Sequence, residues 1–438
     1  MRPKIAFFVF NSGNGDRRVD RQASLLAKNG YDVRIYCFLQ PGLPTQESRH
    51  GYKLLRRDQR GAFNRFFDDE IMARLRPRKP AVTEAVTPQV AVPVDRPPVR
   101  PCPEPPPRRL PIPASEDDRR YWAYIRQINQ IWAKEAIAWK PDLVQAHDCD
   151  ALEAAARTAR ACGSKFVYDS HELWSDQPFI TSQEGIEYWN RVEGQYLGET
   201  DARLTVSVPF AEVLEERYGK PFIPLHNCQD YEVAPPARRG TLRARFGGRP
   251  VALYQGVYGL DRGLEELIAS AAYQEEVVIA LRGYGDREGA MRELARPYPH
   301  VVFLEPCASS DIVASAAEAD FGVIPFLPTC LNHYYNTPNK LFEFMMAGLP
   351  IASADLPDLR RFIEGERIGL LFDPYSLSDI ARGLVELSRR SDLAEMGQRA
   401  HLACKERFNW ATEGQKLLAC YASLGVSAGS GSGAAVPT

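Results

Sequence analysis

The stretch NTPNKLFEFMMAGLPIASADLP, residues 336–357, combines a helix start with charged residues in an apolar setting. Thr337 and Pro338 are typical of an N-cap and a first helical residue, and the Gly-Leu-Pro that follows ends the helix. The free N–H groups and the dipole at such a start favour an anion, and a diphosphate suits it. Because apolar residues surround Lys340 and Glu343, we expect both charges to serve a ligand.

Lys340 and Glu343 predict the two halves of that ligand. Lys340 adds a positive charge within the first turn of the helix, beside the expected diphosphate. Glu343 lies three residues further on nearly the same face. A carboxylate repels an anion, so its better use is to accept hydrogen bonds from neutral hydroxyls, such as the two of a ribose. A sugar nucleotide contains both a diphosphate and a ribose diol.

Short apolar runs alternate with helical patterns on both sides of this stretch, which predicts an α/β protein. We expect two doubly wound, Rossmann-like domains facing each other across a cleft, with the ligand at the carboxyl ends of their strands. The expected strands of the first half are 4–10, 32–38, 142–147, 165–172 and 202–207, with a last strand in 221–230 that leads to a linker. Those of the second half are 250–256, 276–283, 300–306, 320–326, 349–353 and 368–373.

Changes in composition predict the domain boundaries. We place an N-terminal acceptor domain at 1–228 and a C-terminal donor domain at 229–409. Residues 410–424 predict a C-terminal helix that packs back on the N-terminal domain. The Gly/Ser-rich residues 425–438 predict a disordered tail, and the proline-rich insert at 77–113 predicts an extended or disordered excursion.

A helix is expected after Ser115, which is its predicted N-cap. Its apolar face is predicted to hold Tyr121, Ile125, Ile128, Trp132 and Trp139. With the basic segment 53–109, this helix offers a surface that could touch a membrane carrying a lipid-linked acceptor. The alternative, that the helix packs in the core, is equally compatible with the pattern. The expected location is cytoplasmic, with peripheral contact at the inner face of a membrane left open.

The composition argues against several classes of protein. The chain is 45% hydrophobic and 25% charged, as in a soluble globular protein, and its net charge of −2 draws it neither to nucleic acid nor to an anionic membrane. No stretch approaches the roughly 18 apolar residues of a membrane span. The nine cysteines include no CxxC pair and no zinc-like spacing, which indicates reduced thiols. Because Asp148-Cys149-Asp150 has no supporting ligands, we expect no metal.

Two histidines end successive predicted strands, His147 in VQAHDCD and His171, followed by Glu172, in DSHELW. The carboxyl ends of parallel strands are where ligands bind in α/β sheets, so both histidines are candidates for one cleft edge.

Glycine loops follow the first strand of each half. The loop with Gly13 and Asn14 lacks the third glycine of GxGxxG, and no acidic residue ends the second strand, which argues against NAD. Gly256 in the second loop allows close backbone approach. Arg262, near the next helix start, could donate to a phosphate.

Five segments carry a family resemblance: PNKLFEFMMAGLPIASADLPDLRRFIEGERIGLLFDP (338–374), LYQGVYGLDRGLEELI (253–268), VQAHDCDALEAA (144–155), DSHELW (169–174) and ERFNWATEGQKLLACYASL (406–424). They resemble the retaining GT-B glycosyltransferases of the "glycosyl transferases group 1" class, family four. The resemblance implies a GT-B fold and transfer of a sugar from a UDP- or GDP-linked donor, with retention and without a cofactor or metal. It also implies an acceptor, which could be a glycan, a lipid-linked saccharide or a small molecule, and a role in polysaccharide biosynthesis.

The resemblance also assigns roles to individual positions. Glu343 would hold the ribose, the helix start would hold the diphosphate, and His147 would lie against the donor sugar. The implied catalytic residues are His147, Arg262 and Lys340. The implied donor-binding residues are Gly256, Tyr335, Asn336, Thr337, Pro338, Asn339 and Glu343. The candidates on the sugar and acceptor side are Gly13, Asn14, His171 and Glu172.

Two positions depart from the family pattern. Tyr335 stands where the first Glu of the Glu–seven residues–Glu signature is expected, which bears on the identity and orientation of the donor sugar. Val257 replaces the usual Arg after the glycine and removes one phosphate cation. Two alternatives keep the same fold: a nucleotide-sugar 2-epimerase, which needs no acceptor, and a non-catalytic GT-B interaction module.

Overall fold

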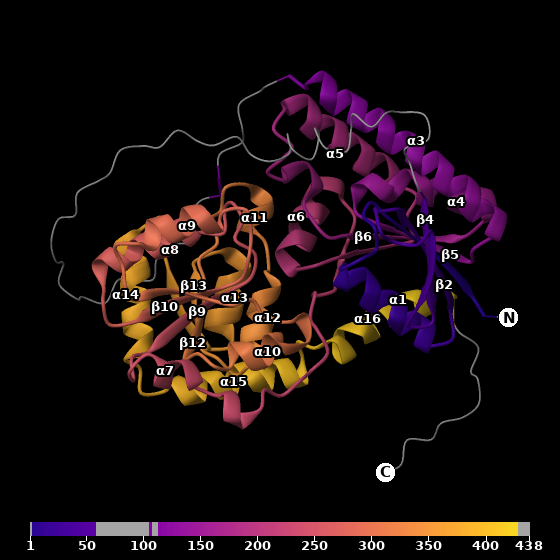
Figure 1. Cartoon of the computed structure of the whole chain (residues 1–438). Helices are drawn as coiled ribbons and strands as arrows, with labels where there is room; N and C mark the ends of the chain where they lie inside the picture. The colour runs from indigo at the N-terminus through magenta and orange to yellow at the C-terminus, as the bar shows by residue number, and fades with distance from the viewer. Residues whose placement is uncertain (1, 58–104, 107–112, 428–438) are drawn as a thin grey trace, which may run out of the picture.

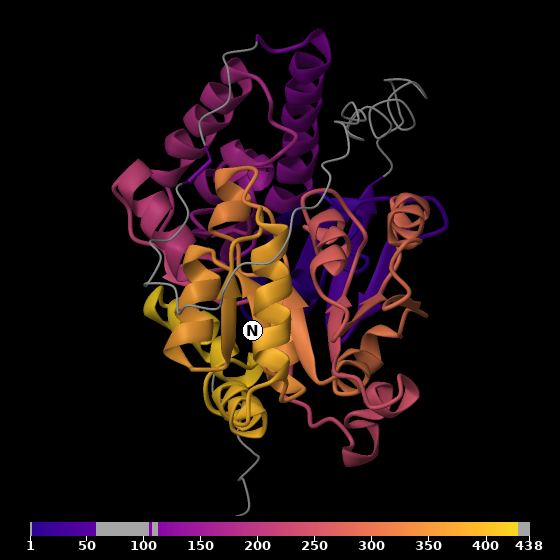
Figure 2. The same ribbon diagram turned by 90° about the vertical axis from the view of Figure 1, so that its left-hand side faces the viewer.

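The computed structural model describes residues 2–57, 105–106 and 113–427. It contains two α/β domains, each built around one sheet, with the N-terminal domain in indigo and magenta and the C-terminal domain in orange and yellow (Figure 1, Figure 2). The insert expected at 77–113 lies almost wholly outside the described residues, and the predicted tail is described only as far as residue 427.

The N-terminal sheet has eight strands, and all its neighbouring pairs are parallel except β3 with β4. Its strands in sheet order are β3 (Gln46–Arg49), β4 (Tyr52–Arg57), β2 (Asp32–Phe38), β1 (Lys4–Val9), β5 (Leu143–His147), β6 (Lys165–Ser170), β7 (Ala202–Thr205) and β8 (Ile223–Pro224). The sequence did not predict β3 and β4. Neither shows a continuous apolar run, because β3 is largely exposed and alternate side chains of β4 face solvent.

The C-terminal sheet has six strands, all paired in parallel. In sheet order they are β11 (Val301–Leu304), β10 (Val278–Arg282), β9 (Val251–Gln255), β12 (Phe321–Ile324), β13 (Ile351–Ala354) and β14 (Gly369–Phe372). All six lie where the sequence predicted them, because each lies in a short, predominantly apolar run. The strand order reverses beside β9, and in the first sheet beside β1, so both domains carry a ligand-binding switch point.

Helices surround both sheets (Figure 1). The N-terminal domain has α1 (Arg17–Lys28), α3 (Glu116–Trp139), α4 (Leu152–Cys162), α5 (Gln183–Leu197) and α6 (Val208–Tyr218). The C-terminal domain has α7 (Thr241–Arg245), α8 (Leu264–Ala269), α9 (Glu288–Ala295), α10 (Ile312–Ala316), α11 (Leu331–Tyr334), α12 (Asn339–Met346), α13 (Pro357–Gly365), α14 (Leu377–Ser388) and α15 (Leu393–Glu406).

The last helix, α16 (Trp410–Ser423), joins the two domains. It follows α15 of the C-terminal domain and packs on α1, with Leu417 and Tyr421 buried in the N-terminal core. A Cβ on Gly414 would meet Leu25 of α1 at 2.7 Å, so a glycine permits this close approach. The Tyr421 hydroxyl donates to the Gln145 side chain of β5 at 2.6 Å. The end of the chain thus reaches the strand that leads to the cleft.

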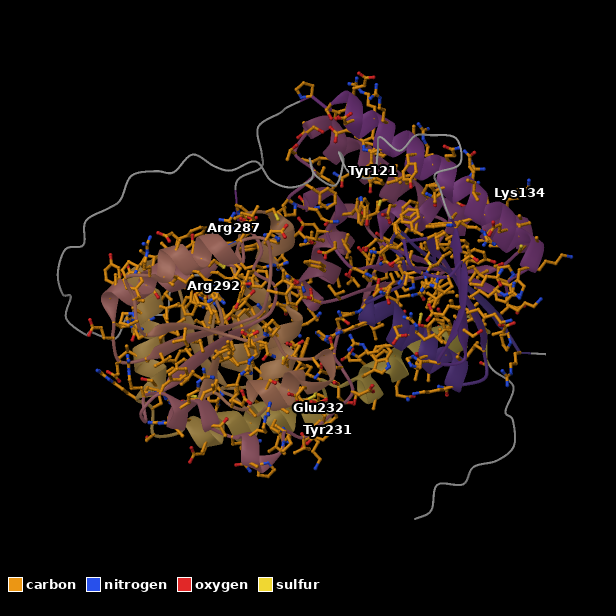
Figure 3. The ribbon with its side chains drawn as sticks, in the orientation of Figure 1. Tyr121, Lys134, Tyr231, Glu232, Arg287 and Arg292 are labelled. Carbon is orange, nitrogen blue, oxygen red and sulfur yellow. The ribbon has the colours of Figure 1, made fainter. Side chains whose placement is uncertain are left out.

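Helix α3 begins at the predicted cap, where Ser115 and Asp118 form a capping box. Ile125, Ile128 and Trp132 are buried in the core of the N-terminal domain, as is Trp122, which the sequence pattern missed. Tyr121 and Trp139 are only partly buried, while Lys134 is exposed on the outer side of the helix (Figure 3). The apolar face of α3 is therefore used inside the domain. No helix in the described part of the chain is long and apolar enough to cross a membrane.

Candidate active site

A cleft of about 570 Å³ lies between the two domains and is lined by residues of both. Most of the residues predicted for the donor site line it, and so do the loops after β9, β10 and β11. The predicted residues in its lining are His171, Glu172, Gly256, Arg262, Asn336, Thr337, Pro338, Asn339, Lys340 and Glu343. Gly13, Asn14, His147 and Tyr335 do not line it.

The C-terminal wall of the cleft carries two cations without acidic partners. Lys340 Nζ lies 3.6 Å from the ring centre of Tyr254, and the Arg262 guanidinium lies 4.6 Å from that of Phe326. No described carboxylate lies within 4.0 Å of either cation. Burial, and then the neighbouring Arg262 charge, hold the pKa of Lys340 well below its usual range, against the attraction of Glu343. Aromatic faces compensate a buried cation only in part, so this wall is prepared for an anion.

The start of α12 lies one residue later than predicted. Its N-cap is Pro338 in an extended conformation, without a side-chain hydrogen bond, and its first helical residue is Asn339. The prediction of Thr337 as N-cap was wrong, because its hydroxyl donates instead to the buried carboxylate of Asp358 on α13. Since no side chain caps α12, its first N–H groups stay available beside Lys340.

The glycine loop after β9 approaches this helix closely. Gly256 has a φ of 143°, and a Cβ there would lie 3.3 Å from Lys340 Nζ. Any side chain at this position would crowd the amine and strain the backbone, which explains the glycine.

Glu343 lies one turn further along α12 and is 7% exposed. Burial raises the pKa of its carboxyl, and Lys340 offsets part of that rise. Arg17 of the opposite domain reaches across the cleft, with Nη1 3.8 Å from Glu343 Oε1. Arg17 was not predicted from the sequence, although it stands at the start of α1, just after a glycine loop.

The N-terminal wall places the two predicted histidines at different depths. His171 is partly exposed and lines the cleft, whereas His147 is buried behind it. His147 Nδ1 lies 3.1 Å from His171 Nε2, and its other nitrogen lies 3.2 Å from the amide of Gln145. His147 can thus act on a ligand only through His171 in this structure.

Asp169, at the end of β6, is the centre of this wall and was not predicted. Its carboxylate accepts bonds from Arg18 at 2.6 and 3.0 Å and from Gln22 at 2.7 Å. It also lies 3.3 Å from His171 and 3.5 Å from His147. Burial alone would raise the pKa of Asp169, but Arg18 and the histidines hold it well below its usual range.

The surroundings shift the pKa values of the two histidines in opposite directions. Burial lowers the pKa of His147. Burial also opposes a charge on His171, but Asp148 and then Asp169 outweigh it and raise the pKa of His171 to about 9. At neutral pH the cleft therefore presents a positive His171 in front of a neutral His147.

Distance alone would let His147, Asp169 and His171 hold a metal, because one ligand atom from each lies within 4.8 Å of the others. The sequence analysis did not find this group, since its members end two different strands. However, the Arg18 guanidinium binds both oxygens of Asp169. A cation there would face a fixed positive charge, so the residues fit a hydrogen-bonded cluster better than a metal centre.

The remaining predicted residues occupy supporting places. Glu172 accepts a bond from the Asn332 amide of the C-terminal domain at 2.5 Å, and burial raises the pKa of its carboxyl. Tyr335 is partly buried and packs edge-on against Tyr334 at 4.7 Å. Gly13 leaves no room for a Cβ beside Leu54 of β4. The part of this loop that lines the cleft begins at Gly15, just after Asn14.

Two family models match the chain. The model described as "Glycosyl transferase 4-like domain" matches residues 15–226, and "Glycosyl transferases group 1" matches residues 249–390. Together they cover most of the chain and nearly all the residues of the cleft. No curated protein matches the sequence significantly.

Several solved structures share the fold. Sucrose-phosphate synthase from Thermosynechococcus elongatus is 16% identical, with a TM-score of 0.71 over 97% of this chain and 99% of its own. HepE of Anabaena, solved in complex with UDP and glucose, is 15% identical, with a TM-score of 0.64 over 96% and 100%. Trehalose 6-phosphate synthase from Burkholderia multivorans is 12% identical, with a TM-score of 0.63 over 97% of both chains. The sequence models and the two facing α/β domains agree, and the chain belongs to the GT-B glycosyltransferases.

Proposed function

We propose that the protein transfers a sugar from a UDP-linked donor to a saccharide acceptor, with retention of the anomeric configuration. The observation that carries this proposal is the pair of unpartnered cations, Lys340 and Arg262, beside the uncapped start of α12. A diphosphate would supply the negative charge that this wall lacks. The choice of uridine is supported by a structural neighbour that was solved with UDP and glucose.

Glu343 would accept hydrogen bonds from the ribose hydroxyls of the donor. It is buried one turn beyond Lys340, so a nucleotide with its diphosphate at the helix start would extend toward it. Arg17 now lies near the same carboxylate and would be displaced by the ribose. Once released, its guanidinium could approach the diphosphate and replace the cation that is missing at Val257.

Transfer would be driven by stabilisation of the leaving group. As the sugar–phosphate bond breaks, negative charge grows on the phosphate oxygens, and Lys340, Arg262 and the α12 N–H groups would stabilise that charge. The acceptor hydroxyl would then form the new bond on the same face of the sugar and lose its proton to the leaving phosphate. This route needs no protein nucleophile and no metal.

The N-terminal wall would hold the sugar and the acceptor. His171 lines the cleft as a positively charged ring, and its two nitrogens face Asp148 at 3.5 Å and Asp169 at 3.3 Å, which fixes the ring. Its positive charge would attract a phosphate oxygen of the donor. Closure of the two domains would exclude water and limit hydrolysis of the donor.

The test is incubation of the full-length protein with UDP-, GDP- and ADP-sugars, with and without saccharide acceptors, in buffer containing EDTA. We expect sugar transfer or slow hydrolysis with a UDP-sugar, undiminished by EDTA, and a product with the donor's anomeric configuration by NMR. A 2-epimerase would instead release UDP and a 2-epimeric sugar without any acceptor. Absence of nucleotide binding by calorimetry would rule out the transferase proposal.

A further inference from the structure

A second cavity, of about 440 Å³, lies within the N-terminal domain and shares no lining residue with the donor cleft. It is a groove between α3, α4 and α5, the helices that rise from the N-terminal sheet at the top of both views (Figure 1, Figure 2). The rings of Trp122 on α3 and Tyr188 on α5 stack at 4.1 Å with an interplanar angle of 6°. This stack fixes the two sides of the groove relative to each other.

The floor of the groove holds a buried acid with one unpartnered oxygen. Asp150 lies in the short turn after β5, is 5% exposed and lines the groove. Its Oδ1 atom has no hydrogen-bond partner among the described residues. The turn itself is held by Asn129, whose amide donates to the Asp150 carbonyl at 2.7 Å and accepts from Ala154 N at 2.7 Å. The Asp150 carboxyl also bonds the backbone N–H groups of Asp150 and Ala151, so Oδ1 alone is left for another partner.

The protonation state of this acid suits a neutral polar partner. Burial, and then the charge of Asp148, raise the pKa of Asp150 well above its usual range. Burial thus favours the protonated carboxylic acid, which can both donate and accept a hydrogen bond. Sugar hydroxyls have the same two capacities, whereas a cation would require an ionised carboxylate.

The rim of the groove is basic. Arg126 on α3 and Arg191 on α5 have no described carboxylate within 4.0 Å, while Arg157 is paired with Glu153 at 2.7 Å. The Arg191 guanidinium lies 5.9 Å from the ring centre of Tyr188. Two free guanidinium groups facing one groove are suited to a phosphate or a carboxylate.

We propose that this groove binds a saccharide that carries a phosphate or carboxylate group. Its hydroxyls would bind Asp150 at the floor, and its acidic group would bind Arg126 and Arg191. Its apolar ring face would pack on the aromatic side chains that line the groove, which are Tyr188, Trp189 and Tyr196. The site is distinct from the donor cleft and does not depend on the function proposed for that cleft.

One short turn connects the two sites. Asp148, two residues before Asp150, accepts a bond from the His171 backbone N–H at 2.8 Å, and His171 lines the donor cleft. A saccharide in the groove therefore lies against the segment that supports the N-terminal wall. It could be part of an acceptor, or a separate ligand that acts on the cleft.

The test measures binding of glucose 6-phosphate, glucose and inorganic phosphate to the full-length protein by calorimetry and saturation-transfer NMR. The key variant is Arg126→Ala combined with Arg191→Ala, which removes only exposed charges. The matched control is Arg120→Ala, which removes another exposed arginine of α3 outside the groove. Asp150→Leu removes the polar floor, while Asp150→Asn keeps a neutral donor and acceptor of the same shape.

We expect glucose 6-phosphate to bind at least tenfold more tightly than either glucose or phosphate. The double arginine variant and Asp150→Leu should each lose at least tenfold, while Arg120→Ala and Asp150→Asn stay within threefold. UDP affinity should be unchanged in all four, which separates this site from the donor site. Equal binding by the double arginine variant, or phosphate binding as tight as that of glucose 6-phosphate, would overturn the proposal.

A second arm of the experiment identifies the source of the ligand. Glucose 6-phosphate is incubated with UDP-glucose and the protein, and the products are separated by mass. A glycosylated sugar phosphate whose formation fails in the double arginine variant identifies the groove as an acceptor subsite. Binding without glycosylation identifies a separate ligand, and both results support the proposed site.

Discussion

On the N-terminal wall of the cleft, Asp169 and Arg18 form an ion pair with two hydrogen bonds. On the C-terminal wall, in contrast, Lys340 and Arg262 have no acidic partner among the described residues. A buried charge without a partner costs folding free energy, and a protein keeps it where a ligand supplies the opposite charge. The paired wall holds a fixed geometry, and we propose that the unpaired wall receives an anion. Substitutions on the two walls should therefore act on different properties.

The largest effect is expected on the paired wall, as a loss of stability. Arg18→Met leaves the Asp169 carboxylate buried without its main partner and should lower the free energy of unfolding by about 3–5 kcal/mol. The matched control is Arg160→Met, which breaks the exposed pair with Glu199 and should cost less than about 1 kcal/mol. Urea unfolding followed by circular dichroism measures both. Equal losses in the two variants would remove the distinction between the walls.

On the unpaired wall we expect loss of ligand binding with little loss of stability. Glu343→Ala should weaken UDP binding more than tenfold, because the ribose hydroxyls lose their acceptor, about 1.4 kcal/mol or more. The free energy of unfolding of the Glu343→Ala variant should not fall, since burial already disfavours the charged carboxylate of Glu343. Calorimetric titration with UDP measures the affinity. Unchanged affinity would argue against the ribose role of Glu343.

A smaller effect should appear in the pH dependence of stability. The pKa of His171, about 9, lies above the usual value of about 6.5. Its proton therefore stabilises the fold fully below about pH 6.5, and this stabilisation is lost as the pH rises through 9. His171→Gln should flatten the curve in this window, by up to about 3 kcal/mol at about 1.4 kcal/mol for each pKa unit. Parallel curves for the two proteins in urea unfolding between pH 6 and 9.5 would refute the assignment.

The smallest effect concerns protons taken up with the ligand. Because the pKa of Lys340 is lowered in the empty cleft, a bound diphosphate should raise it again. UDP binding at pH 8 should then take up part of a proton, measured by calorimetry in two buffers of different ionisation enthalpy. The uptake should disappear in Lys340→Met. The same uptake in that variant would place the titrating group elsewhere.

Most of the fold could be predicted from the sequence, because its buried strands are short apolar runs between turn residues. The strands at 32–38 and 251–255 lie within the runs that predicted them. The partly exposed strands β3 and β4 were missed, because their many polar side chains leave no clear alternation of apolar and polar residues in the sequence. The N-cap of α12 was predicted one residue too early, at Thr337. The hydroxyl of Thr337 donates to Asp358, which lies in a different helix and could not be paired with it from local sequence.

The two walls of the site were predictable to different degrees. Lys340 and Glu343 lie in one helix, so their spacing alone placed them together. Asp169 and Arg18 are 151 positions apart, and their contact depends on the order of the strands. No local pattern contains that information. The contact between Arg17 and Glu343 depends in addition on how the two domains face each other.

The central claim is that the unpaired cations of the C-terminal wall bind the diphosphate of a nucleotide donor. The most direct measurement compares UDP with uridine by calorimetric titration, in the native protein and in Arg262→Ala combined with Lys340→Ala. We predict that UDP binds at least a hundredfold more tightly than uridine in the native protein, about 2.7 kcal/mol. In the double variant this preference should fall to tenfold or less, with uridine binding unchanged. Equal affinity for UDP and uridine in the native protein, or a preference that survives in the double variant, would contradict the account.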